Sequence, residues 1–99
     1  LAVPLPGWTL LAWALLAVSR GLAVSLAPDV RVNAVSPGAI LWPDGGIDAD
    51  VQAALLAQTP LGRVGNPDDI AGTVAWLLGD AAGYVTGQVI HVDGGRHTT

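Results

Sequence analysis

Three aspartates close together are the first side chains in this sequence that suggest chemistry. Asp44, Asp48 and Asp50 lie beside two glycines, and carboxylates in a glycine-containing loop are typical ligands of Ca²⁺. An EF-hand loop, however, ends on a distal Glu, and this chain contains no Glu. The spacing therefore favours solvated carboxylates in a loop and at the start of a helix, where they face the positive end of the helix dipole.

Two histidines are the other candidate metal ligands. His91 and His97 lack further ligands at the spacing that known metal motifs use, so the sequence predicts no metal site. His91 alternates with two apolar residues, Ile90 and Val92, in a short β-branched run. We expect it to point to solvent or toward a subunit partner from an edge strand.

Several reactive side chains are missing. The chain has no Cys, which excludes disulfides, thiolate metal sites and thiol catalysis. All four basic residues are Arg, so no ammonium group is available, and Tyr84 is the only phenol. Eight acidic groups against four dispersed basic ones give a net charge of −4, which argues against nucleic acid as a partner.

The beginning of the chain is strongly apolar. The whole sequence is 52% hydrophobic and 12% charged, whereas about a quarter of residues are charged in an ordinary soluble domain. Apolar residues spaced three or four apart predict a helix over residues 8–27, ended by Pro28. Residues 1–18 lack a basic start and an unbroken apolar run of about 20 residues, so a buried helix is favoured over a membrane or export segment, which stays an alternative.

Strands alternate with helices in the rest of the chain. Asn66 as N-cap, Pro67 at the first helical position and two following aspartates predict a helix that Gly79 ends. Such alternation indicates a parallel α/β sheet, and two strands alone are too few to form a self-sufficient one. The predicted elements are a strand over 30–35, a loop over 36–48, helices over 49–57 and 66–78, and a strand over 88–92.

Three stretches, taken together, resemble the C-terminal half of the short-chain dehydrogenase/reductases. They are RVNAVSPGAI, PLGRVGNPDDIAGTVAWLL and YVTGQVIHVDGG, in the order and spacing of that family. The resemblance covers residues 13–96, and residues 1–12 are a divergent start. It implies that residues 1–99 are a C-terminal fragment of one Rossmann-type domain, with part of a doubly wound parallel sheet. PGAILWPDGG followed by TPLGR looks most like the bacterial pteridine reductase branch.

The resemblance also implies a cofactor edge. In that family Pro37-Gly38 ends a strand, and the backbone near Ile40 meets the carboxamide of the nicotinamide. The implied cofactor-binding residues are Pro37, Gly38, Ala39 and Ile40. The implied cofactor is NADP, and the implied reaction is hydride transfer from the nicotinamide to a C=N or C=O bond of a small molecule.

The loop over residues 41–48 corresponds to the substrate lid of the family. This assigns Leu41 and Trp42 to the substrate, with Trp42 as a wall for a flat aromatic molecule such as a pterin. The family often has Thr at the position of Trp42, where it contacts the pyrophosphate. That departure weakens the inherited cofactor contact.

The rest of the family's machinery has no counterpart in the chain. The glycine-rich turn that seats the pyrophosphate and the catalytic Ser belong to upstream segments. Counted back without gaps from Arg20, the positions of the catalytic Tyr and Lys hold Trp8 and Ala12. An alternative alignment places Gly7-Trp8 on the family's Gly-aromatic step before the motif and deletes part of the motif. We therefore assign no catalytic residue and expect the isolated chain to be inactive.

The helix over residues 8–27 has a further implied role. In the resembled family it packs against its copy in a neighbouring subunit, and an apolar helix suits such a site. The resemblance thus implies a homo-oligomer in the cytoplasm, and a membrane or export segment stays the less favoured alternative. The alternative function is a non-enzymatic docking module that uses this helix.

Overall fold

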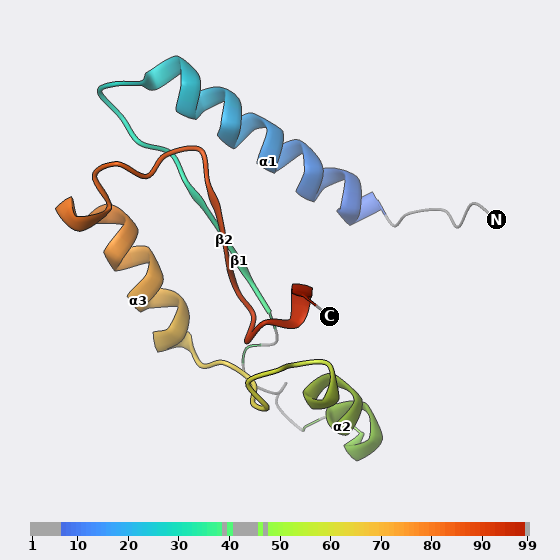
Figure 1. Ribbon diagram of the computed structural model, residues 1–99. Coiled ribbons are helices and arrows are strands. Elements are labelled where there is room, and N and C mark those ends of the chain that lie inside the picture. Colours follow the sequence, from blue (N-terminus) through green and yellow to red (C-terminus); the bar gives the residue numbers. More distant parts are fainter. Residues whose placement is uncertain (1–6, 39, 41–45, 47, 99) are drawn as a thin grey trace.

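The computed structural model describes residues 7–38, 40, 46 and 48–98. Helices alternate with two strands, which confirms the predicted α/β class (Figure 1). In chain order the elements are α1 (Gly7–Leu26), β1 (Ala34–Pro37), α2 (Ala49–Ala57), α3 (Pro67–Leu78), the short 3₁₀ turn η1 (Asp80–Ala82), β2 (Val89–Val92) and the 3₁₀ turn η2 (Arg96–Thr98).

The two strands form a parallel pair. Ala34 lies opposite Val89, and Pro37 lies opposite Val92. The bounds of β2 agree with the prediction to within one residue. The predicted bounds of β1 were wrong, because this strand occupies residues 34–37 and not 30–35. The reason is the partner strand, since β2 is four residues long and fixes which part of the β-branched run can form a ladder.

Ahead of the ladder, the backbone of Val32 bonds to the turn that precedes β2. Its N–H donates to Oγ1 of Thr86 at 3.1 Å, and its carbonyl accepts from the N–H of Gly87 at 2.8 Å. These bonds hold residues 32–33 beside the segment that leads into β2. Both residues precede the first residue of β1.

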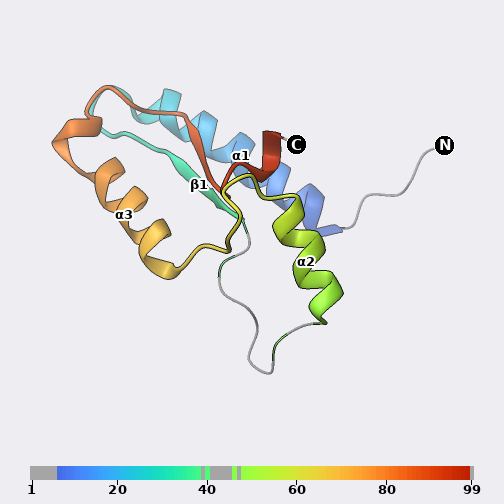
Figure 2. The same cartoon turned by 60° about the horizontal axis from the view of Figure 1, so that its bottom comes forward.

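Helices lie on both faces of the strand pair. α1 lies on one side of the strand pair, and α3 packs on the other (Figures 1 and 2). A Cβ at Gly87 would lie 3.5 Å from the Cβ of Ala23, so α1 packs closely over the entry to β2. Within the described part of the chain the buried apolar residues are Ala23, Leu77 and Ala82.

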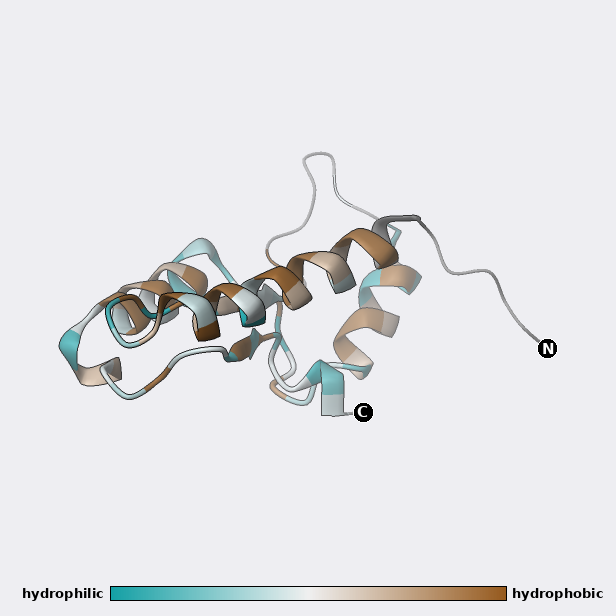
Figure 3. Ribbon diagram, turned by 90° about the horizontal axis from the view of Figure 1, so that it is seen from above, coloured by the Kyte–Doolittle hydropathy of each residue, from teal (hydrophilic) through white to brown (hydrophobic). Residues whose placement is uncertain are grey.

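The helix α1 agrees with its prediction to within one residue at each end. Its last turn is closed by the carbonyl of Leu26, which accepts from the N–H groups of Asp29 and Val30. Apolar side chains along α1 are exposed, and Figure 3 shows the apolar colour running along the helix. No helix among the described residues is both long and apolar enough to cross a membrane.

Polar caps set the starts of the other two helices. Asp48 caps α2 by accepting the N–H of Asp50 at 2.7 Å, so these two carboxylates occupy a helix start as predicted. Asp44 lies outside the described residues. Asn66 caps α3, and the Asp69 carboxylate accepts the N–H of Asn66 in return, which forms a capping box.

Candidate functional site

The carboxyl ends of β1 and β2 lie side by side at one edge of the sheet, where parallel α/β folds bind their ligands. Gly38 follows β1, and its N–H donates to the carbonyl of Val92 at 2.9 Å. A Cβ at Gly38 would lie 2.7 Å from both Cα and Cβ of Asp93. Gly38 is therefore needed for the close packing of the two strand ends.

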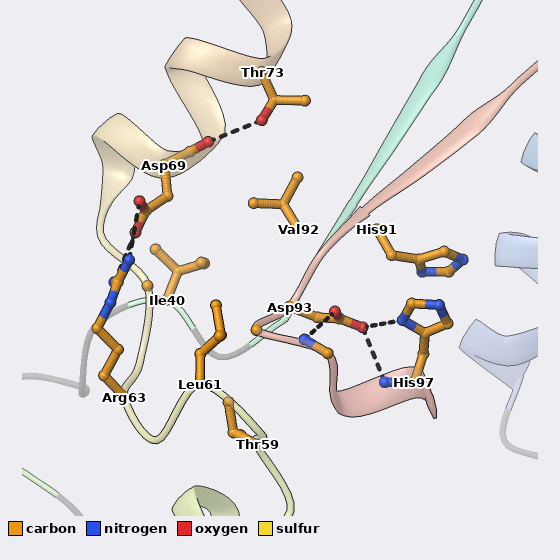
Figure 4. Close-up of a pocket in the computed structure, with 13 residues that line it drawn as sticks. Ile40, Thr59, Leu61, Arg63, Asp69, Thr73, His91, Val92, Asp93 and His97 are labelled. Atoms are coloured by element: carbon orange, nitrogen blue, oxygen red, sulfur yellow. Dashed lines mark hydrogen bonds and ion pairs between the residues drawn. The ribbon is translucent and has the colours of Figure 1, made fainter. Parts of the chain in front are cut away.

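A hollow of about 450 Å³ opens at this edge, within the size range of small-molecule sites (Figure 4). Its walls come from the loop after β1, the segment that leads into α3, and the turn that follows β2. The side chains that give it chemical character are Ile40, Arg63, Asp69, His91, Asp93 and His97.

One wall carries an ion pair between Arg63 and Asp69. Nη1 of Arg63 lies 3.0 Å from Oδ2 of Asp69. The hydrogen bond from Arg63 is the main cause that lowers the pKa of Asp69, and the N–H of Asn66 adds to it. The same hydrogen bond raises the pKa of Arg63. Because both side chains are partly exposed, the pair positions Arg63 more than it stabilises the fold.

The opposite wall is built around Asp93, whose side chain is 9% exposed. Its Oδ1 accepts the N–H of Gly95 at 3.0 Å, and its Oδ2 accepts the N–H of His97 at 3.1 Å. Nδ1 of His97 lies 2.9 Å from the same Oδ2. Burial by itself raises the pKa of the Asp93 carboxyl, but the hydrogen bonds from Gly95 and His97 together outweigh it and lower the pKa.

The His97 ring also stacks on the ring of His91. Their centroids are 4.1 Å apart and the planes differ by 18°. His91 is exposed, as predicted for an edge strand. Asp93, which directly follows β2, was not predicted as a partner of the two histidines.

The cofactor edge predicted from the resemblance lies partly within the described residues. Pro37 and Gly38 end β1, and Ile40 forms an isolated parallel bridge with Gly65 and lines the hollow. The other predicted residues, Ala39 in the cofactor edge and Leu41 and Trp42 in the substrate loop, lie outside the described residues.

A dinucleotide needs more than this edge, and α2 and α3 do not supply it. A helix N-terminus binds pyrophosphate through free N–H groups and its positive dipole. Here the caps Asp48 and Asn66 take up N–H groups, and the carboxylates Asp50 and Asp69 add negative charge. The starts of α2 and α3 therefore do not fit a pyrophosphate, and the described residues do not form a complete cofactor site.

The fold and this edge define a class of protein. Rossmann-like α/β folds have parallel strands with helices on both sides of the sheet. They also have strand ends that pack closely because a glycine follows the strand. Residues 10–97 match the family model described as Enoyl-(Acyl carrier protein) reductase. The chain belongs to the short-chain dehydrogenase/reductase family.

Individual relatives support the same conclusion. The chain is 52% identical to an uncharacterized oxidoreductase of Methylorubrum extorquens over 87 residues, which cover 83% of this chain and 35% of that protein. It is 41% identical to the 3-oxoacyl-[acyl-carrier-protein] reductase FabG of Aquifex aeolicus, with 82% of this chain and 34% of that protein covered. The chain thus spans about a third of the length of the curated relatives it matches.

A solved structure gives the same fold. The 4-hydroxyisoleucine dehydrogenase complexed with NADH superposes with a TM-score of 0.81 at 26% identity, over 87% of this chain and 37% of that one. Members of the family use NAD(P)(H) and act on small molecules. The resemblance found in the sequence is confirmed at the level of the family.

Proposed function

We propose that this chain is the C-terminal part of an NAD(P)(H)-dependent short-chain oxidoreductase and is inactive by itself. The assignment to the oxidoreductases rests on the edge of the sheet where β1 and β2 end. There Gly38 packs against Asp93 beside a hollow of small-molecule size. This edge would form one side of a nicotinamide and substrate pocket, which the rest of the fold completes.

The inactivity follows from the groups that hydride transfer needs. Reduction of a carbonyl or imine requires a proton donor as well as the hydride, and the family uses a Tyr whose pKa an ammonium group lowers. The chain has no Lys, and Tyr84 precedes β2, so it lies toward the amino end of the parallel pair, opposite the hollow. Trp8 and Ala12, at the family's catalytic positions, both lie in α1.

For specificity we propose NADPH as the cofactor and a pterin-like flat molecule as the substrate. The support is the likeness of PGAILWPDGG and TPLGR to the pteridine reductase branch, in which Trp42 would face the substrate. The 4-hydroxyisoleucine dehydrogenase structure contains NADH, so NADH is the competing cofactor to test.

A second role is favoured by the exposed apolar face of α1. Leu11 and Leu15 are 72% and 65% exposed, an unfavourable arrangement for large apolar side chains unless another molecule covers them. We propose that α1 mediates homo-oligomer formation, and that the chain alone acts as a docking module through the same helix. The proposed location is the cytoplasm.

The proposal is tested with the isolated chain and a chimera. In the chimera, residues 13–96 replace the matching segment of the Aquifex aeolicus reductase, whose own first two thirds supply the missing groups. We expect no oxidation of NADPH or NADH by the isolated chain with carbonyl or pterin substrates. We expect the chimera to oxidise cofactor with the host's 3-oxoacyl substrate.

The matched control is the chimera with Gly38→Val, which should fold less well and lose activity because a side chain there meets Asp93. Turnover by the isolated chain would contradict its inactivity. A chimera that folds but oxidises neither cofactor would contradict the assignment of the strand-end edge to cofactor binding.

A further inference from the structure

Three side chains that carry metal-ligating atoms meet where β2 ends. His91 lies in β2, Asp93 directly follows it, and His97 lies in η2; we name them the His–Asp–His cluster. One ligating atom from each lies within 4.8 Å of the ligating atoms of the other two. Figure 4 shows the three side chains close together on one wall of the hollow, with the two rings stacked and Asp93 beside His97.

Asp93 is already held in place for such a role. The N–H groups of Gly95 and His97 fix its two carboxylate oxygens, and little of the side chain is exposed. Oδ1 keeps one lone pair after accepting the N–H of Gly95, whereas Oδ2 accepts the backbone N–H of His97 and also lies beside Nδ1 of the His97 ring. The carboxylate is therefore an oriented ligand, and its position does not have to be created when an ion binds.

The two imidazoles can reach an ion that Asp93 holds. A tetrahedral ion with bonds of about 2.0 to 2.2 Å sets neighbouring ligand atoms about 3.3 to 3.6 Å apart. Nδ1 of His97 and Oδ2 of Asp93 are 2.9 Å apart. An ion that replaces the hydrogen between them would lie to one side of the line that joins the two atoms, and the atoms would separate by about 0.4 to 0.7 Å.

His91 has to move further. The two rings are nearly parallel, so their planes do not converge on one point, and one ring must turn. His91 is exposed and His97 is half exposed, so a turn about the side-chain bonds disturbs no packed core.

The donor set selects the class of ion. Two imidazole nitrogens and one carboxylate oxygen suit Zn²⁺ and its first-row neighbours, whereas Ca²⁺ and Mg²⁺ prefer oxygen ligands alone. The nearby cation Arg63 is engaged by Asp69 on the opposite wall, which limits its repulsion of a bound metal.

We infer that the His–Asp–His cluster binds one Zn²⁺-like ion, which would fasten η2 to the end of β2. The fourth position of a tetrahedral ion would be left for water or for a ligand in the hollow. This role goes beyond the proposed oxidoreductase function. The cluster lines the same hollow, but none of its three residues is among the four assigned to the cofactor.

The test is a metal titration of the chain over residues 1–99, produced without a histidine tag and stripped of metal. Co²⁺ serves as the spectroscopic probe, because its visible bands report nitrogen and oxygen ligands directly. We expect one Co²⁺ per chain, displaced by Zn²⁺ but not by Mg²⁺ or Ca²⁺. The variants His91→Gln, Asp93→Asn and His97→Gln should each bind at least about tenfold more weakly, since each lacks one of three ligands.

Asp50→Asn is the matched control, since it removes an exposed carboxylate in α2 and should leave binding unchanged. Circular dichroism of each variant separates loss of a ligand from loss of structure, and His91→Gln is the most informative variant because His91 is exposed. Absence of Co²⁺ and Zn²⁺ binding would overturn the inference. Equal binding by all three variants and the unaltered chain would overturn it as well.

Discussion

Asp69 has two roles at the start of α3: it completes the capping box and pairs with Arg63. The ion pair needs the ionised carboxylate, and the hydrogen bond from the N–H of Asn66 is stronger to it, so both interactions lower the pKa of Asp69 below the ordinary value of 3.8. A group whose pKa is lower in the folded state stabilises that state above its unfolded pKa. The contribution disappears as the pH falls through the folded pKa.

We predict that Asp69→Asn lowers the free energy of unfolding at neutral pH, and that the difference from the unaltered chain shrinks toward zero as the pH falls below about 4. Urea unfolding over the range from neutral to acid measures it. Asp68→Asn removes a neighbouring charge outside the pair and should give a smaller loss at neutral pH. If Asp69→Asn still lowered the free energy of unfolding in acid, the stabilising role of the ionised Asp69 carboxylate would be contradicted.

Gly38 is a second residue whose role rests on its immediate surroundings. The Cβ of an alanine there would lie 2.7 Å from the backbone of Asp93, so one strand end has to shift. We predict that Gly38→Ala destabilises the fold by about 1 to 3 kcal/mol, as overpacking usually does. The control is Gly21→Ala in α1, where a Cβ meets nothing within 4 Å and should stabilise by up to about 1 kcal/mol. Equal effects in urea unfolding would contradict this role.

Among the elements, α3 holds the sheet through one face. Leu77 is buried, whereas its neighbour Leu78 is 79% exposed. We predict that Leu77→Ala costs about 2 to 3 kcal/mol, because it leaves a cavity between α3 and the strands. Leu78→Ala should change stability by no more than about 0.5 kcal/mol. Thermal or urea unfolding measures the stability of the two variants. Similar losses of stability would mean that α3 does not pack on the strands through Leu77.

The sequence predicts those elements best whose signals are local. The cap at Asn66 and the stop at Gly79 define α3 from the chain itself, and the apolar spacing does the same for α1. The start of β1 is not local, because it depends on where β2 lies beside it. The β-branched residues before Ala34 have strand-forming side chains but no ladder partner.

The same distinction applies to the candidate site. The edge at Gly38 was predicted through the resemblance, which encodes a backbone arrangement shared by a family. The His–Asp–His cluster was missed because His97 reaches Asp93 only after the chain turns through Gly94 and Gly95. Both glycines have a positive φ, and spacing counted along the sequence does not convey that reversal.

The whole molecule exposes more surface than its mass requires. Its accessible surface is 7229 Å², whereas a compact monomer of 10.0 kDa exposes about 5,200 Å². The excess is larger than the roughly 800 Å² that one partner buries in a standard protein interface. Together with the apolar side chains along α1, this excess supports the proposal that α1 is covered by another polypeptide.

We predict that the chain associates in a concentration-dependent manner and that Leu15→Asp in α1 shifts it toward the monomer. A charge in the apolar face of α1 opposes burial of that face against a second copy. Sedimentation or light scattering over a range of concentrations measures the effect. Leu61→Asp, at an equally exposed position outside α1, is the control and should change association less. Equal shifts by both variants would mean that α1 is not the interface.

The parallel register has a consequence for how the protein is made. Ala34 pairs with Val89, 55 residues further along the chain. At synthesis rates of about 5 to 20 residues per second, β1 waits roughly 3 to 11 s on the ribosome before β2 exists. Throughout that time its backbone is open to the wrong strands, and the exposed apolar α1 has already been made. We expect these exposed segments to make the nascent chain prone to bind chaperones until β2 has been made.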